Sequence, residues 1–437
     1  MGDLAISDLV ATRTAVALLT AEAPYRSACL FFLFLSVEAI FVVPIKVYPF
    51  CFMLFSACVG LWFLAGDRRR TFPWQQTTLW TLCFSYLVYA AGLFCYSGGD
   101  RDFALRLAVN VIFFLATSAF LLSLHGSHER WLVRRTITRA LFVAVAFSAI
   151  QTLVNVARGH LWLQPASITS SVDAYAIQNA GAVLFGDQNK NIWATKTLLA
   201  YLVFFALRRE QGRRRGVDKV SFISLLIVLA YTSSRTAQLA FLLGWGAHWL
   251  HERWPKLRTA GRVGLGLLAA GGAFVAVGVS RILELGNINL LQGTGGDGFL
   301  GRLTLWLYFY FAAPGFSWQQ VIFGHGVSAV TAFVSRAFAE NNLHNVFLNQ
   351  FFDFGLIGLA LYTAFLVFSF RFLGRRWRWL FAPAVLVIIC SQYFGFDPEL
   401  MLFFAMSALV GQRYPRQRSE AVLRTTQAMR PARLQPS

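Results

Sequence analysis

A histidine at the entrance to an apolar run is the residue of this chain best placed to carry chemistry. His344 stands in the polar stretch ENNLHN, directly before an apolar run long enough to cross a membrane. The start of a helix carries partial positive charge, which keeps a nearby histidine neutral and able to accept a proton. The stretch allows two interpretations: a polar helix entry capped by Asn341 and Asn342, or a general base at the membrane surface.

Two arginines are set at similar boundaries. Arg235 ends the turn YTSSR between two apolar runs, and Arg302 follows a glycine-rich segment and precedes the aromatic stretch LTLWLYFYF. An arginine at a dry boundary is costly without an anionic partner, and its planar guanidinium can bind a phosphate through two parallel hydrogen bonds. Each could also contact a lipid headgroup or a carboxylate, so the residue type alone leaves both alternatives open.

Several other polar residues lie at expected span entrances. In FGDQNKNIW, Asp187, Asn189 and Lys190 could line the same cavity, or they could form a helix cap with a snorkelling lysine. His325 lies between two glycines in FGHGVS. The acidic residues are scattered and the six cysteines show no paired spacing, so we predict neither a metal site nor a cofactor.

Membrane helices must position these residues, because the chain is too apolar to be water-soluble. Of its 437 residues, 57% are hydrophobic and 14% charged. A span needs about 20 apolar residues, and the sequence offers about twelve such runs, centred near residues 34, 56, 87, 113, 146, 199, 226, 243, 271, 357, 388 and 405. We therefore expect an all-α polytopic membrane protein in which Glu38 is the clearest carboxylate within a span.

The distribution of positive charge predicts the orientation. Most of the 39 Lys and Arg residues fall in alternate connections and in the C-terminal tail, which is the positive-inside pattern and places both termini in the cytoplasm. The net charge of +19 is thus explained by topology and lipid-headgroup contacts. Nucleic-acid binding is not predicted.

The expected organisation follows from these spans. Residues 1–24 lack a clean apolar core and are expected to be a cytoplasmic lead-in rather than a cleaved signal peptide. Spans one to nine occupy residues 25–280 with an outer segment at 157–190, a large outer loop covers 281–343, the last three spans occupy 344–411, and 412–437 is a basic cytoplasmic tail. Within the large loop, LTLWLYFYF is too short to span and is expected to lie on the outer membrane boundary.

Three motifs, taken in order, resemble the O-antigen ligase family. They are SSRTA at Arg235, the GR at Arg302 before an aromatic helix, and HNVFLNQFFDFGLIG from His344. The resemblance covers roughly residues 185–410, and Asn345 follows the histidine as the family pattern expects. It implies a GT-C-like membrane fold with twelve spans and a large periplasmic loop between spans 9 and 10.

The resemblance also implies an activity. The family transfers a finished O-antigen glycan from undecaprenyl pyrophosphate to a sugar hydroxyl of lipid A core, on the periplasmic side of the bacterial inner membrane. His344 takes the place of the catalytic histidine, and Arg235 and Arg302 take the places of the arginines that bind the pyrophosphate. The lipid-linked pyrophosphate is already a good leaving group, so the expected reaction is an inverting transfer without metal or cofactor.

Three alternatives stay open. An O-antigen polymerase or a protein-glycan ligase would share the chemistry and differ in the acceptor. Polymerases of this family more often have two sizeable outer loops, and the outer segment from Ala157 to Lys190 is compatible with that. A transporter or flippase of lipid-linked glycan would instead need paired broken helices and ionisable groups in mid-membrane. Glu38 is the clearest carboxylate within a span, and one such acid is little support for a transport pathway, because the other polar groups collect at the outer face.

Overall fold

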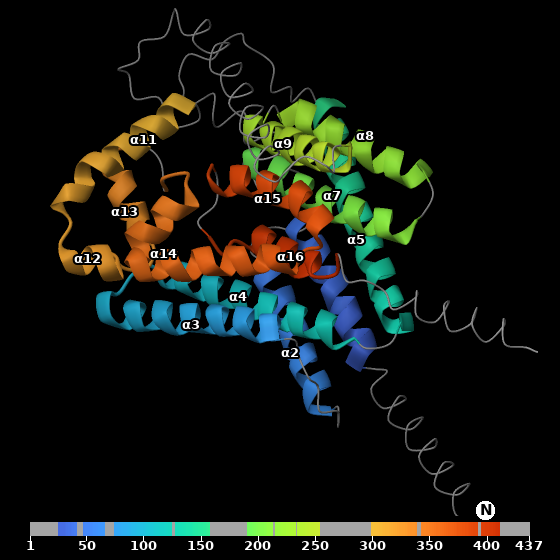
Figure 1. Ribbon diagram of the computed structural model, residues 1–437, viewed down its shortest axis with the longest axis horizontal. Helices are drawn as coiled ribbons and strands as arrows, with labels where there is room; N and C mark the ends of the chain where they lie inside the picture. Colours follow the sequence, from blue (N-terminus) through green and yellow to red (C-terminus); the bar gives the residue numbers. More distant parts are fainter. Residues whose placement is uncertain are drawn as a thin grey trace, which may run out of the picture.

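The computed structural model describes residues 25–41, 47–65, 74–124, 127–157, 190–212, 215–232, 234–253, 299–338, 342–391 and 395–410. Within these ranges the chain forms helices and the turns that join them, together with one isolated bridge between Gly99 and Val327 (Figure 1). A first helix covers residues 25–41. It is followed by α2 (Tyr48–Ala65), α3 (Trp74–Ser97), α4 (Arg101–Ser123), α5 (Ser127–Ala157), α7 (Lys190–Gln211), α8 (Arg215–Thr232), α9 (Arg235–Arg253), α11 (Phe299–Ala312), the short 3-10 helix η2 (Ala313–Gly315), α12 (Trp318–Phe323), α13 (Ala329–Ser335), α14 (Val346–Phe372), α15 (Arg375–Ile389) and α16 (Pro398–Ser407).

Four of the described helices are long and apolar enough to cross a membrane. They cover Gln76–Ser97, Arg101–Leu121, Glu129–Ala157 and Val346–Phe372, and α2 and α16 are shorter apolar helices. Helices overlie each of the predicted runs except the one near residue 271, which lies outside the described residues. The described part of the chain is therefore all-α, as predicted, and suits a membrane protein.

Close packing joins the helices into one body. Phe52 of α2 stacks on Phe113 of α4 with ring centroids 3.6 Å apart. On the other side α9 lies against α15, and a Cβ at Gly244 would come within 2.6 Å of the Leu380 carbonyl oxygen. A larger side chain at Gly244 would push these two helices apart, so glycine is required for this approach.

The chain of α14 is broken at Gly355, where φ is +63°. Gly324, which ends α12, packs its backbone directly against this break, with no room for a Cβ on either glycine. The hydroxyl of Tyr89 on α3 lies 2.8 Å from the Phe323 carbonyl and 2.9 Å from the Phe354 carbonyl. These contacts fasten α12 to α3 and α14, so the segment from α11 to α13 covers one end of the body (Figure 1).

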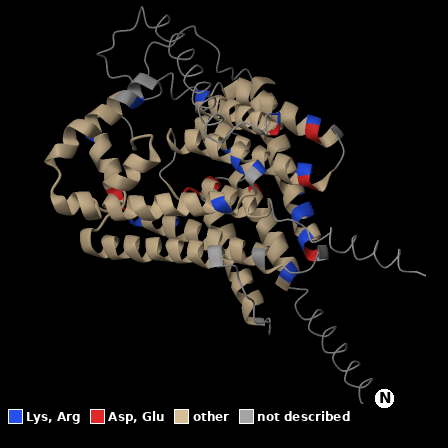
Figure 2. Ribbon diagram, viewed as in Figure 1, with Lys and Arg blue, Asp and Glu red and all other residues tan. Residues whose placement is uncertain are grey.

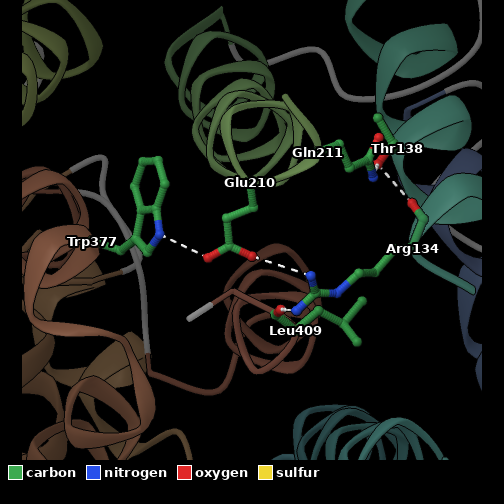
Figure 3. Close-up of polar contacts among 6 residues, drawn as sticks. All are labelled: Arg134, Thr138, Glu210, Gln211, Trp377 and Leu409. Atoms are coloured by element: carbon green, nitrogen blue, oxygen red, sulfur yellow. Dashed lines mark hydrogen bonds and ion pairs between the residues drawn. The ribbon is translucent and has the colours of Figure 1, made fainter. Parts of the chain in front are cut away.

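A polar cluster ties helices together at the opposite end (Figure 3). Arg134 of α5 lies 3.3 Å from the Glu210 carboxylate of α7 and also donates to the Leu409 carbonyl, beyond α16. The indole of Trp377, in the first turn of α15, donates to Glu210 at 2.9 Å. Four segments distant in sequence therefore meet around one ion pair.

Further ion pairs lie beside this cluster. Arg26 contacts Glu129 at 2.8 Å, and Arg208 contacts Asp218 at the same distance. Charged ribbon segments of both signs gather on this side of the body, away from α11, α12 and α13 (Figure 2). These contacts lie next to the connections from α4 to α5, from α7 to α8 and from α14 to α15, so these three connections share one end of the bundle.

Candidate active site at the starts of α9, α11 and α14

One turn of α11 links two separate segments. Arg302 donates from Nη1 to the hydroxyl of Thr236 at 3.3 Å, and Trp306 donates from its indole Nε1 to the Leu343 carbonyl at 2.8 Å. Four residues rise about 6 Å along a helix. The first turns of α11 therefore bridge the start of α9 and the loop that precedes α14.

This bridge brings the predicted site segments together. Thr236 directly follows Arg235, and Leu343 directly precedes His344, while Arg302 lies on the bridging helix itself. Arg235 is exposed, and the other two are half-buried. A histidine and two arginines that are far apart in sequence thus border the same end of the bundle.

His344 is held in an unusual backbone conformation. Its φ is +49°, in the left-handed region that few residues other than glycine adopt. Its N–H donates to the Asn342 side chain at 2.6 Å, and the N–H of Leu343 donates to the Asn349 side chain at 3.0 Å. Such a conformation costs about 1–3 kcal/mol and persists only where the surroundings enforce it, which is typical of functional sites.

The helix after His344 begins later than predicted. Asn345 is the cap of α14 and its side chain accepts the first free amides of the helix at 3.0 and 3.3 Å. The interpretation that Asn341 and Asn342 cap this helix is wrong for Asn342, which accepts the His344 N–H before α14 begins. Asn341 lies outside the described residues. Asn345 therefore supports the site by fixing where the helix starts.

The start of α9 adds positive potential next to Arg235. The carbonyl of Ser234 accepts the Gln238 N–H at 2.9 Å, so the helix opens at this point. The hydroxyl oxygen of Ser234 is buried and has no hydrogen-bond partner among the described residues. Free amides at a helix start favour an anion, and this adds to the charge of the arginine.

His325 is anchored on α14. Its ring stacks on Phe352 with centroids 4.0 Å apart and planes 4° apart, and its Nδ1 lies 3.1 Å from the Phe352 carbonyl. Burial lowers the pKa of His325 below its ordinary value, and the hydrogen bond to the carbonyl opposes this only in part. These contacts dock the connection between α12 and α13, which is further held where Asp353 accepts the Val330 N–H at 2.7 Å.

The third predicted cluster is described only at its edge. Asp187 and Asn189 lie outside the described residues, and Lys190 opens α7 without a described side chain. Glu38 is buried in the helix 25–41, and its carboxylate oxygens have no hydrogen-bond partner within the described ranges. Nor do any three His, Cys, Asp or Glu side chains of the described residues form a group that could hold a metal ion.

Sequence reasoning missed the residues that connect the site. Trp306 lies in an aromatic stretch that predicts only a membrane-boundary helix, and nothing in SSRTA distinguishes Thr236 as a partner for an arginine. Asn349 did carry a signal, because an amide within an otherwise apolar run needs a partner when buried.

No family model matches the chain, and no curated protein matches it. The contacts of the site therefore carry the functional argument. The described residues form a helical protein with apolar helices long enough to cross a membrane. The candidate site lies at the end opposite the ion pairs of Arg26, Arg134 and Arg208.

Proposed function

We propose that this protein is a membrane glycosyltransferase of the O-antigen ligase type, which transfers O-antigen polysaccharide from undecaprenyl pyrophosphate to a sugar hydroxyl of lipid A core. The observation that carries the proposal is the bridge made by α11, which sets Arg302 beside the start of α9 and holds the backbone before His344. The left-handed backbone of His344 supports a functional rather than a packing role.

The residues divide the chemistry between them. Arg235, Arg302 and the free amides at the start of α9 bind the pyrophosphate and stabilise the charge that develops on it as the bond to the sugar breaks. His344 accepts the proton of the acceptor hydroxyl while that oxygen attacks the anomeric carbon from the opposite face. The new glycosidic bond forms as the carrier pyrophosphate leaves, and the configuration inverts without a metal ion.

The topology belongs to the same proposal. We place the protein in the bacterial inner membrane with about twelve spans in a GT-C-like arrangement and both termini in the cytoplasm. The gathering of the basic connections at one end of the bundle supports this orientation, because the positive-inside rule assigns that end to the cytoplasm. The starts of α9, α11 and α14 then face the periplasm, where both lipid substrates meet.

Alternatives within the family differ only in the acceptor. A polymerase would extend another carrier-linked glycan, and a protein-glycan ligase would modify a polypeptide. From another class, a flippase is favoured by the buried carboxylate of Glu38 and by the break in α14 at Gly355. A single buried acid and one broken helix are less than the paired broken helices that such a transporter needs.

The deciding experiment combines purified protein, carrier-linked glycan and lipid A core in the presence of a chelator. We expect joined product from the wild type and a fall of at least about 100-fold in His344→Ala, the loss typical of a removed general base. His251→Ala, in the last turn of α9, is the control and keeps full transfer. Intact transfer by His344→Ala would contradict the mechanism, lengthened carrier-linked chains would identify a polymerase, and no product at all would favour the transporter.

A further inference from the structure

We infer that Trp306 is a positioning residue, whose indole N–H holds the peptide group before His344 and so keeps the histidine in its reactive orientation. This inference rests on the function proposed above, because it gives the indole a part in that reaction. Trp306 itself has no described contact with the histidine ring; the Leu343 carbonyl links the two.

Both polar atoms of one peptide group are bound. The peptide that joins Leu343 to His344 contributes its oxygen to the indole of Trp306 at 2.8 Å and its N–H to the side chain of Asn342 at 2.6 Å. The orientation of this peptide plane sets φ of His344, which is +49°. Residues other than glycine adopt this region in only a few per cent of cases, so the indole hydrogen bond helps to maintain the strained backbone.

Packing fixes the direction of the indole. Leu305 and Phe309, on either side of Trp306, are buried in a small core cluster with Leu343 and Phe352, and Trp306 packs against that cluster. The helix therefore cannot rotate without breaking this core. Because the cluster includes Leu343 itself, the donor and the acceptor of the hydrogen bond belong to one packed unit.

The position of Trp306 on α11 separates its role from that of Arg302. The arginine lies one turn earlier and contacts Thr236, so its place at the start of α9 does not require the indole hydrogen bond. Loss of the indole N–H should therefore disturb proton transfer by His344 while leaving donor binding in place. This separation predicts a change in kcat without a change in KM for the carrier-linked donor.

The test uses Trp306→Phe, which keeps an aromatic ring and removes the donor. We expect kcat to fall about tenfold, the order expected for one lost hydrogen bond, with the donor KM unchanged. Trp318→Phe is the matched control, because Trp318 on α12 is 66% exposed and its loss should leave kcat unaltered. Replacing Trp306 by its benzothiophene isostere, which lacks only the N–H, should reproduce the effect of phenylalanine with all packing retained.

Hydrogen exchange supplies a readout independent of turnover. Amides of residues 342–346 should exchange faster in Trp306→Phe than in the wild type and in Trp318→Phe. Equal exchange rates, an unchanged kcat in the isostere, or a change confined to KM would each overturn the inference. Those results would leave the proposed function standing if His344→Ala is inactive, whereas an active His344→Ala would remove the proposed function and the role assigned to Trp306 together.

Discussion

At the end of the bundle that holds the basic connections, Arg134 contacts the carboxylate of Glu210 and a main-chain carbonyl, whereas at the opposite end Arg302 contacts the hydroxyl of Thr236. A carboxylate neutralises a guanidinium, and the pair then serves to join helices. A hydroxyl satisfies one N–H without changing the charge. The contacts at the first end join helices, and the contact at the second end joins the two segments that carry the proposed site.

The backbone conformation also differs between the two ends. Around Arg134, three helices and the chain after α16 meet through an ion pair and a hydrogen bond to the Leu409 carbonyl (Figure 3). Around His344, the chain leaves the common backbone conformations and is held there because the side chains of Asn342 and Asn349 accept backbone N–H groups and the Trp306 indole donates to a backbone carbonyl. Within the described ranges, the strained backbone of His344 thus lies where we place the chemistry, and ion pairs join helices at the other end.

The largest effect on stability is expected from Arg134→Met. The Arg134 side chain is 4% exposed, and its loss leaves the Glu210 carboxylate without the guanidinium. Breaking a fully buried ion pair costs about 3–5 kcal/mol of unfolding free energy, and the loss here should lie at the lower end because Glu210 is 20% exposed and keeps the Trp377 indole N–H. Denaturant unfolding in detergent measures this loss, and transfer activity per folded molecule should be unchanged.

Two further variants test whether burial sets the stability cost of losing Arg134. Arg26→Gln removes a pair whose side chains are 30% and 27% exposed, so its cost should stay below about 1 kcal/mol. The double variant Arg134→Met/Glu210→Leu should recover much of the lost stability, because no charge is then left buried alone. Equal losses for Arg134→Met and Arg26→Gln would show that burial does not distinguish these pairs.

Arg302→Gln should act on catalysis instead. Losing a guanidinium at the pyrophosphate is expected to lower kcat/KM by about 100-fold, or roughly 2.7 kcal/mol. The kcat/KM of Arg302→Lys should lie between those of the wild type and Arg302→Gln, since lysine keeps the positive charge and lacks the planar guanidinium. Thermal unfolding should change little in either variant.

Arg336→Gln is the matched control for Arg302. Arg336 caps α13 at the same end of the protein and is exposed, so the variant removes the same charge from the same face. If both variants lower kcat/KM equally, the effect is one of surface charge and the comparison between the two ends fails.

Much of the helical framework could be predicted, because apolar runs of spanning length have few other stable forms in a membrane. The polar residues at helix entrances could be predicted as well, and they include His344, Arg235 and Arg302. The sequence does not show where α14 starts, because Asn341, Asn342 and Asn345 all have side chains that can cap a helix, and only the structure shows that Asn345 does so.

The contacts that hold the site could not be predicted. Trp306 and Leu343 are separated by 37 positions, and their hydrogen bond depends on how α11 packs on α13 and α14. The φ of His344 depends on that bond and on Asn342 rather than on local preference. In the sequence, a tryptophan in LTLWLYFYF is indistinguishable from an ordinary membrane-boundary anchor.

The smallest effect on unfolding free energy is expected from His325, which lies between α12 and α13. Its pKa in the folded protein lies below the ordinary value of 6.5 because it is buried. The unfolded chain therefore binds a proton more readily than the folded one as the pH falls through that value. The stability contributed by neutral His325 is complete above pH 6.5 and is lost as the pH falls below it.

His325→Phe isolates this contribution, because phenylalanine can keep the stacking on Phe352 and cannot titrate. The difference in unfolding free energy between wild type and variant should shift in favour of the variant as the pH falls below 6.5, the ordinary histidine value, and stay constant above it. Arg134 and its carboxylate partner lie at the other end of the protein. The change in unfolding free energy caused by His325→Phe should therefore depend on pH in the same way when Arg134→Met is also present. A pH-independent difference between wild type and His325→Phe would mean that burial does not keep the ring neutral.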